Sequence, residues 1–235
     1  MSTIVRSIEN KAEKNIRKWQ QSEKAKERLA RPDAQKHIGP YLAISRETGA
    51  CGSELARLVA DRLHWDVLDQ EIVDYMEANY GTPRCLLQRV DEKHENWLSS
   101  IITSRIGGLG FSEQTYSHRV AILLAMAASH GNVVIVGRGA RYLLPRDQGL
   151  SVRVVAPMDF RLKQIMDAEK LNAKDARRFI VETDHDRNAY IKDHFGKNAN
   201  DPHLYDLVVN TGDVSLDDAA DTIIASLSHR MKEAA

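Results

Sequence analysis

The 235-residue chain is poor in cysteine, in long apolar runs and in excess charge of either sign. Its two cysteines, Cys51 and Cys85, form no CxxC pair and no Cys/His cluster, which argues against a disulfide framework and a structural zinc site. The longest apolar run, Val120 to Ala128, is far shorter than the roughly 20 residues that span a bilayer. The 33 basic residues balance the 33 acidic ones, which argues against a dedicated partner for nucleic acid polymers or membrane surfaces.

The N-terminus lacks an apolar secretion segment, so we expect a cytoplasmic location. The sequence does have a hydrophobic fraction of 43% and a charged fraction of 28%, which are ordinary values for a globular protein. Its length fits one large domain, or one domain with appendages, that buries a proper core.

Residues 1–38 differ from the rest of the chain and predict a charged helical arm. The arm has a narrow apolar stripe at helical spacing, formed by Val5, Ile8, Ala12, Ile16 and Trp19. Glu13–Arg17 and Glu27–Arg31 are favourable i,i+4 pairs, and the helix is expected to end near Pro32. Two interpretations stay open: an arm for dimerisation or docking, which would make a homo-oligomer, or a solvated helix lying on the core.

Residues 39–235 alternate short β-rich runs with amphipathic helices. The predicted strands are 41–44, 65–68, 133–136, 152–155 and 207–209. A helix is expected over Glu54–Leu63, and a final helix opens at Ser215 with Asp218 in capping-box position. Apolar strands separated by helices indicate a buried parallel sheet in an α/β layer fold. Residues 70–130 and 159–200 lack strands and are expected to be largely helical, with a loop at Gly107–Gly110.

The loop after the first strand, Ser45 to Ser53, has the layout of a phosphate-binding loop. Small residues let the backbone turn tightly, and the following helix N-terminus offers unpaired N–H groups to an anion. The loop is not a Walker A sequence, since the chain nowhere contains G-x4-G-K-[ST]. The phosphate-reaching lysine is missing, and Arg46 at the mouth of the loop is the candidate to supply that charge. The alternative is a tight strand-to-helix turn without a ligand.

A second candidate, Gly137-Arg138-Gly139, follows the third predicted strand. It imitates a dinucleotide fingerprint, but Tyr142 stands where the third glycine should be, which disfavours an NAD-dependent oxidoreductase. Arg138 is the more informative residue, because a charge at the end of a buried strand usually has a partner or an anionic ligand. The alternative is a salt bridge to a carboxylate such as Asp69.

A third cluster, residues 182–190, is rich in acids with one arginine. In a helix, Asp186 and Tyr190 would share a face, as would Asp184 and Arg187. Such a face could grip a phosphate or a ribose. Taken alone, the cluster fits a solvated helix face better.

Together these segments resemble the cytidylate kinase-like family, relatives of the bacterial CMP kinases among the P-loop nucleoside monophosphate kinases. The resemblance runs from about Tyr41 to Leu227 and excludes the N-terminal arm. It is carried by the order and spacing of six segments, namely Ile44–Ser53, Leu68–Ile72, Ile135–Ala140, Asp159–Arg161, Asp184–Tyr190 and Asp201–Thr211. The last of these is the most specific.

The resemblance implies a P-loop kinase fold with a five-stranded parallel sheet, a helical insert at about 70–130 and a lid at about 170–200. It implies transfer of the γ-phosphoryl group from ATP, with Mg²⁺, to a nucleoside monophosphate such as CMP or to another small acceptor. The donor would be held by Arg46, Gly49, Ala50, Cys51, Gly52, Ser53 and Arg161. The metal would be held by Ser53 and Asp69. The acceptor would be held by Asp69, Arg138, Asp184, Arg187 and Tyr190.

In this interpretation Arg46, Arg138 and Arg187 are the catalytic residues. A second hypothesis is a nucleotide-binding sensor or regulatory module without turnover, with the arm as its interaction surface. The missing lysine favours the sensor, whereas Ser53, Arg138 and Arg187 favour the enzyme.

Overall fold

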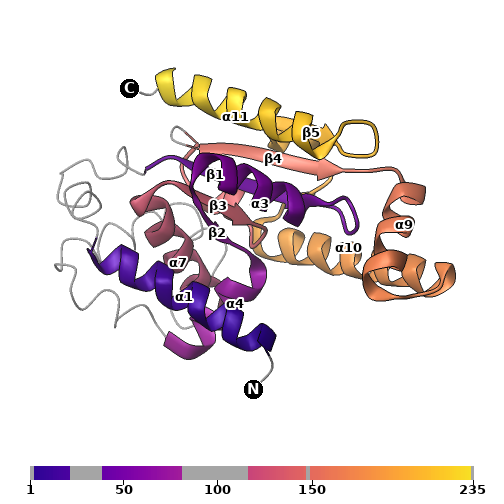
Figure 1. The fold of residues 1–235 in the computed structure, drawn as a ribbon, viewed down its shortest axis with the longest axis horizontal. Coiled ribbons are helices and arrows are strands. Elements are labelled where there is room, and N and C mark those ends of the chain that lie inside the picture. The colour runs from indigo at the N-terminus through magenta and orange to yellow at the C-terminus, as the bar shows by residue number, and fades with distance from the viewer. Residues whose placement is uncertain (1–2, 22–38, 81–115, 147–148, 234–235) are drawn as a thin grey trace.

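The computed structural model describes residues 3–21, 39–80, 116–146 and 149–233 (Figure 1). All five strands pair in parallel, in the order β2-β3-β1-β4-β5. They are β1 (Tyr41–Arg46), β2 (Asp66–Leu68), β3 (Val133–Val136), β4 (Gly149–Val155) and β5 (Leu207–Asn210). The predicted α/β class and parallel sheet are therefore confirmed, and β4 begins earlier than predicted.

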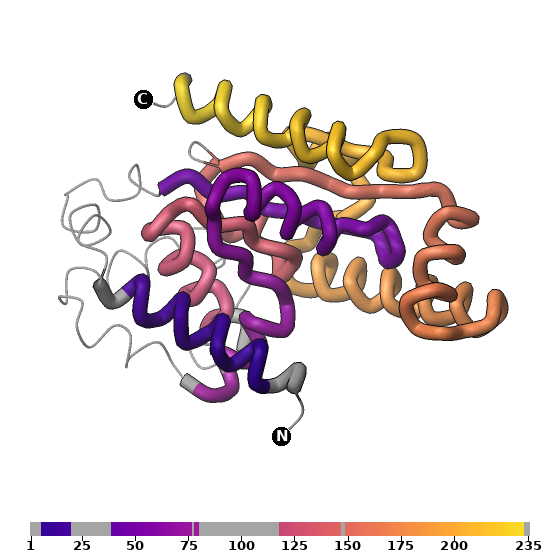
Figure 2. Tube along the Cα trace, in the orientation of Figure 1, coloured from indigo at the N-terminus to yellow at the C-terminus, as the bar shows by residue number. Residues whose placement is uncertain are grey.

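Helices cover both faces of the sheet (Figures 1 and 2). One face carries α3 (Gly52–Leu63) and α11 (Leu216–Glu233), which pack against each other. The opposite face carries α7 (Tyr116–His130), α8 (Ala140–Leu143), α4 (Gln70–Tyr80) and α1 (Thr3–Gln21). No helix within the described residues is long and apolar enough to cross a membrane.

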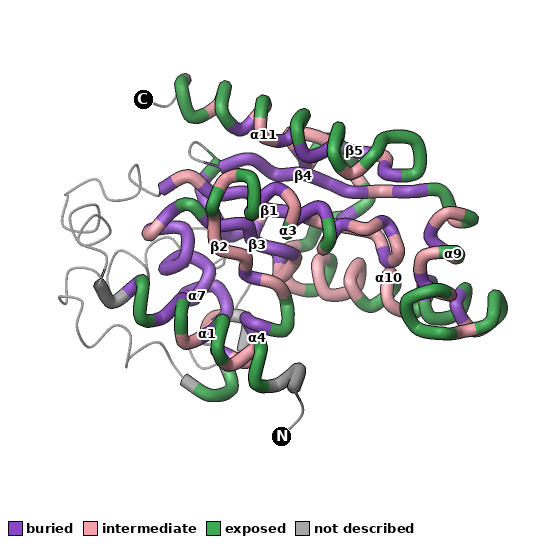
Figure 3. Tube along the Cα trace, in the orientation of Figure 1, coloured by how far each residue is buried: buried purple, intermediate pink, exposed green. Residues whose placement is uncertain are grey.

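Alternation along the strands divides the core into two layers. Ala43 of β1 faces the α7 side, whereas Leu42 and Ile44 face the α3 side, and all three side chains are buried. Figure 3 shows β1, β3 and β4 as almost continuously buried between the two helix layers, whereas the edge strands β2 and β5 are only partly buried. The apolar character of the strands on both faces follows from this double cover.

The N-terminal helix α1 lies on the core. Ala12, Ile16 and Trp19 of its apolar stripe are buried, and the Trp19 ring stacks on His130 with 5.6 Å between centroids. Lys18 pairs with Asp66 of β2. Much of the stripe is thus used within the chain. Residues 22–38, including the expected helix end at Pro32, lie outside the described residues, and a homo-oligomer through the arm stays a prediction.

The hairpin of α9 (Met158–Glu169) and α10 (Ala173–Phe195) lies beyond the carboxyl end of β4 (Figure 1). The two helices share a small apolar cluster of Ile165, Ala176 and Ile180. Most of the predicted lid segment, at about 170–200, forms α10, and its role as a lid stays a prediction. Of the predicted insert, the structure describes α4 and α7, and the expected loop at Gly107–Gly110 lies outside the described residues.

The connections of the sheet fix where a ligand is expected. β1 leads through α3 to β2 on one side, whereas β3 leads through α8 to β4 on the other side of β1. Neighbouring strands whose connections diverge leave a crevice outside their carboxyl ends, which is where open α/β sheets bind ligands. The crevice here lies next to the ends of β1 and β3.

Asp206 fastens the start of β5 to β4 and α11. Its carboxylate accepts hydrogen bonds from the Ser151 N–H at 2.8 Å and the Ser151 hydroxyl at 2.7 Å. Arg146 and Arg230 pair with it at 2.7 and 3.1 Å. Burial alone would raise the pKa of Asp206, but the bonds from Ser151 and the two guanidinium groups outweigh burial and hold the pKa below its usual value.

We expect Asp206→Asn to lower the free energy of unfolding at pH 7 by about 2–4 kcal/mol, because the charged acceptor of a buried network is lost. A depressed carboxyl pKa stabilises the fold above the unfolded-state value of about 3.9, and that stabilisation is lost as pH falls through the folded-state pKa. Denaturant unfolding from pH 7 to pH 3 measures both effects. An equal loss of stability in wild type and variant on acidification would contradict this role of Asp206.

Candidate functional site

Two cavities lie side by side at the expected crevice. The strand cavity, of about 440 Å³, is formed by the ends of β1 and β3, by β4, and by α8 and α10. The loop cavity, of about 500 Å³, is formed by residues 46–49 and 51–54, the start of α4, and α9 and α10, while the predicted donor residue Ala50 is buried and does not line it. Four residues line both cavities and mark their junction: Arg46, Gln70, Thr183 and Arg187.

The loop after β1 has the tight backbone that the sequence predicts. Gly49 and Cys51 adopt left-handed conformations, with φ of 79° and 53°. A Cβ at Gly49 would lie 2.7 Å from the Arg161 carbonyl oxygen, so only glycine fits there. Gly52 and Ser53 open α3 and line the loop cavity, and first-turn amides of a helix have no acceptor within the helix. This lining suits an anionic group such as a phosphate.

Arg46 extends from the end of β1 into the junction. A Cβ at Gly137 would lie 2.5 Å from an Arg46 guanidinium nitrogen, so the arginine passes directly over that glycine. Burial, and next the charge of Arg187, lower the pKa of Arg46 to about 10, while Asp69 opposes the shift. Arg46 stays protonated at neutral pH. Arg46 therefore places a cation at the junction of the two cavities, next to a loop that lacks the Walker lysine.

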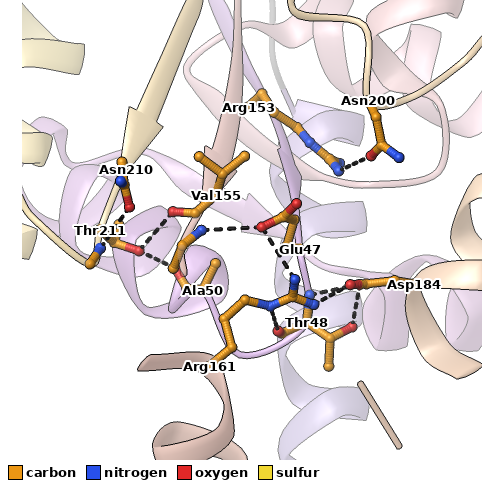
Figure 4. A network of polar contacts seen from close by, with 12 residues as sticks. Glu47, Thr48, Ala50, Arg153, Val155, Arg161, Asp184, Asn200, Asn210 and Thr211 are labelled. Carbon is orange, nitrogen blue, oxygen red and sulfur yellow. Dashed lines mark hydrogen bonds and ion pairs between the residues drawn. The ribbon is translucent and has the colours of Figure 1, made fainter. Parts of the chain in front are cut away.

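Asp184 of α10 holds the loop from the other side (Figure 4). One of its oxygens accepts both the Thr48 N–H and the Thr48 hydroxyl at 2.8 Å. Arg187 donates to the same hydroxyl at 2.9 Å and lies 4.0 Å from the Asp184 carboxylate, while burial lowers the pKa of Arg187. The shared face of Asp184 and Arg187 therefore contacts the loop and is not a solvated surface.

Arg161 of α9 completes this contact. Its Nε donates to the Thr48 carbonyl at 2.7 Å, and its other nitrogens pair with Asp184 and, at 3.4 Å, with Glu47 (Figure 4). The side chain is buried and lines neither cavity. Arg161 therefore fastens the loop to α10, and its role beside the donor base stays a prediction.

Ala50 is tied to the sheet by Thr211 of the most specific sequence segment. The Thr211 hydroxyl lies 2.9 Å from the Ala50 carbonyl and 3.3 Å from that of Val155. Cys51 has a thiol whose pKa is raised by burial and by Glu54, so it is protonated at neutral pH. The loop is thus held at both ends by side chains from distant parts of the chain.

Arg138 lines the strand cavity at the end of β3. It pairs with Asp74 of α4, so the salt bridge considered from the sequence exists with a carboxylate other than Asp69. Tyr190 lines the same cavity and stacks on His194 with 4.2 Å between centroids. These two residues lie apart from the loop cavity.

Asp69 and Ser53 both line the loop cavity. One Asp69 oxygen accepts the Ile72 N–H at 3.0 Å and caps the start of α4. A carboxylate and a hydroxyl are the oxygen donors that Mg²⁺ accepts together with phosphate oxygens and water, so the pair fits the predicted metal. Within the described residues, no group of three or more His, Cys, Asp or Glu side chains could hold a metal ion by itself.

Arg153 is a charged site residue that sequence reasoning missed. It lies on β4 and lines the strand cavity, where it donates to the Ser45 hydroxyl at 2.8 Å and to the Asn200 side-chain oxygen at 2.9 Å. Its guanidinium carbon is 6.0 Å from the centre of the Tyr205 ring. The available signal was a single charge within the otherwise apolar predicted strand 152–155, and it resembles the charge after a buried strand that identified Arg138.

Comparisons with known proteins agree with the sequence motifs. Residues 41–213 match the cytidylate kinase-like family. A cytidylate kinase from Pyrococcus horikoshii is 28% identical over 103 residues, which are 44% of this chain and 53% of that protein, so the match spans about half of the relative. An uncharacterized protein from Eubacterium ventriosum superimposes with a TM-score of 0.65 at 23% identity, covering 81% of this chain and 98% of that one. The latter similarity shows the fold alone.

We expect Asp184→Asn to release the loop from α10, because an amide cannot match a carboxylate as acceptor for Thr48 and partner of Arg161. The free energy of unfolding should fall by about 1–3 kcal/mol, and the Thr48 amide should exchange its hydrogen faster. Hydrogen exchange followed by NMR measures the local effect. Glu182→Gln, an exposed change on the same helix, is the matched control. Unchanged exchange at Thr48 in D184N would show that the contact does not hold the loop.

Proposed function

We propose that this chain, which belongs to the cytidylate kinase-like family, transfers the γ-phosphoryl group of ATP to a small phosphorylated acceptor, with a nucleoside monophosphate such as CMP as the first candidate. The observation that carries this proposal is the pair of cavities that share Arg46 and Arg187. A donor in one cavity and an acceptor in the other would meet at these two cations. Transfer between two bound molecules requires this arrangement.

The loop cavity is the donor site of the proposal. The loop from Arg46 to Ser53 would hold the donor phosphates, as its tight backbone and the start of α3 favour an anion. Ser53 and Asp69 would hold Mg²⁺. When bound, the ion would neutralise part of the charge on the phosphate chain.

The strand cavity is the acceptor site. Arg138 and Tyr190 line it away from the loop, and its volume falls within the range of about 300–1,000 Å³ usual for small-molecule sites. The acceptor phosphate would lie at the junction, where Arg46 and Arg187 can contact it.

The chain's residues position the two phosphates and compensate their charge. An oxygen of the acceptor phosphate forms the new bond to the γ-phosphorus, the bond from that phosphorus to the bridging oxygen breaks, and ADP leaves. No general base is needed, because the attacking oxygen is already anionic. Arg46 and Arg187 would stabilise the charge spread over the transferred oxygens, and α10 would exclude water.

A nucleotide-binding sensor without turnover is the second candidate. The contact between Asp184 and the Thr48 N–H favours it, because that backbone donor of the loop already has a carboxylate acceptor. The absence of the Walker lysine also favours the sensor. A sensor would bind the donor nucleotide, but no acceptor would take the γ-phosphoryl group and no ADP would be released.

ADP release in the presence of ATP, Mg²⁺ and a panel of nucleoside monophosphates and other small acceptors separates the two candidates. We expect release with a particular acceptor, and a loss of at least about a hundredfold in Arg138→Ala, because a charged contact to the acceptor disappears. Thermal unfolding checks that the variant is folded. Nucleotide binding by calorimetry with no turnover on any acceptor would replace the enzyme by the sensor.

We expect Arg46→Ala to weaken ATP binding by about tenfold or more, since the cation that faces the loop cavity is lost. Titration calorimetry with ATP and Mg²⁺ measures the effect. Arg178→Gln, which removes an exposed arginine from α10, is the control for a general change of charge. Equal ATP affinity in wild type and R46A would show that Arg46 does not take the place of the missing lysine.

A further inference from the structure

The strand cavity has more positive charge than a single phosphate requires. Its charged lining residues are Arg46, Arg138, Arg141, Arg153, Arg187 and Asp186. Asp186 is exposed on the surface of α10. One anionic group at the junction would face Arg46 and Arg187, and would leave the charges of the arginines that line the strand cavity alone to be balanced by other partners.

Arg153 and Arg161 are the two buried arginines in the described part of the chain, with exposures of 7% and 6%. The positive charges of these two arginines have different partners. Arg161 pairs with the carboxylates of Glu47 and Asp184. Arg153 has no carboxylate within ion-pair distance among the described residues, and its partners Ser45 and Asn200 are neutral.

A buried guanidinium with neutral partners retains a charge that an anion can neutralise. Burying an unpaired charge is costly, so buried charges in proteins are usually paired with a group of opposite charge. The ring of Tyr205 offsets only part of this cost, because a cation–π contact is weaker than pairing with a buried carboxylate, and the guanidinium carbon is 6.0 Å from the ring centre. Since Arg153 lines the cavity, a ligand there can reach it.

The position of Arg153 separates it from the junction and from Arg138. Arg153 and Arg138 line the strand cavity alone, whereas Arg46 and Arg187 line both cavities. β4 carries Arg153 and β3 leads to Arg138, with β1 between them, so the two strands are roughly 10 Å apart across two strand spacings. Arg138 already has Asp74 as its partner. The unmatched charge therefore lies on the β4 side of the cavity.

We infer that the acceptor has a second anionic group, a phosphate or a carboxylate, which binds Arg153. The inference rests on the proposed function, and it narrows the acceptor to phosphorylated small molecules with two anionic groups. CMP has one anionic group, so the inference favours a phosphorylated acceptor with a further phosphate or carboxylate over CMP itself. The first group accepts the phosphoryl group at the junction. The second stays unchanged and fixes the orientation of the molecule against β4.

Binding of matched ligands to the wild-type protein without ATP tests the inference. Glycerol 3-phosphate and 3-phosphoglycerate differ by a carboxylate, and ribose 5-phosphate and ribose 1,5-bisphosphate differ by a phosphate. We expect the doubly anionic member of at least one pair to bind about ten- to a hundredfold more tightly, as a charge-assisted contact is gained. The pair that shows the preference identifies the second group. Equal affinities within both pairs would overturn the inference.

Variants assign the preference to Arg153. Arg153→Gln should remove the preference by weakening the binding of the doubly anionic ligand far more than that of the singly anionic one, and Arg153→Lys should restore part of the preference. Arg138→Gln should weaken both members of a pair equally. Thermal unfolding reports whether each variant is folded, and if R153Q is not, the comparison of R153K with wild type replaces it. A preference that R153Q or R153K leaves intact would overturn the assignment.

Turnover is measured separately, so the two proposals fail in different ways. A preference for doubly anionic ligands without ADP release would overturn the phosphotransferase and leave the anion site at Arg153. ADP release with a nucleoside monophosphate, and no preference within either pair, would overturn the anion site and leave the phosphotransferase.

Discussion

Burial of arginines at the carboxyl edge of one parallel sheet is the constraint on which the site depends. Each buried guanidinium loses hydrogen bonds to water and needs other interactions in their place, and these interactions differ from one arginine to the next. Arg161 pairs with two carboxylates and fastens the loop to α10, whereas Arg138 pairs with Asp74. Arg46, whose pKa burial lowers to about 10, lies between the two cavities. The same charges that would be costly in an apolar core make this edge suitable for an anionic ligand, as the proposed function requires.

The sequence was sufficient to predict the sheet and the loop. Apolar runs gave all five strands, because a parallel sheet covered on both faces leaves little doubt about which segments are buried. The loop before α3 followed from its small residues and its place after β1. Contacts between distant segments were harder to predict. Helical spacing places Asp184 and Arg187 on one face of a helix but does not indicate what that face contacts. Thr48, their partner, is more than a hundred residues away in the sequence.

Arg161 and Arg153 show why a sequence motif alone does not identify the residues that line a cavity. Arg161 was expected beside a donor base because of the motif it belongs to, and it lies in a contact between the loop and α10. Arg153 belongs to a strand and attracted no prediction, yet it lines a cavity. A motif identifies a residue type at a position, whereas burial and the charge of the neighbours decide what the residue can bind. Those neighbours come from β1 and from the segment before β5.

The central claim is that donor and acceptor phosphates meet between Arg46 and Arg187. A crystal structure with a bisubstrate analogue, in which adenosine and the acceptor nucleoside are joined by a polyphosphate, tests it most directly. The account predicts that the adenosine end lies in the loop cavity, the acceptor end lies in the strand cavity, and the phosphate chain passes both arginines. An analogue confined to one cavity, or a chain that passes neither arginine, would contradict it.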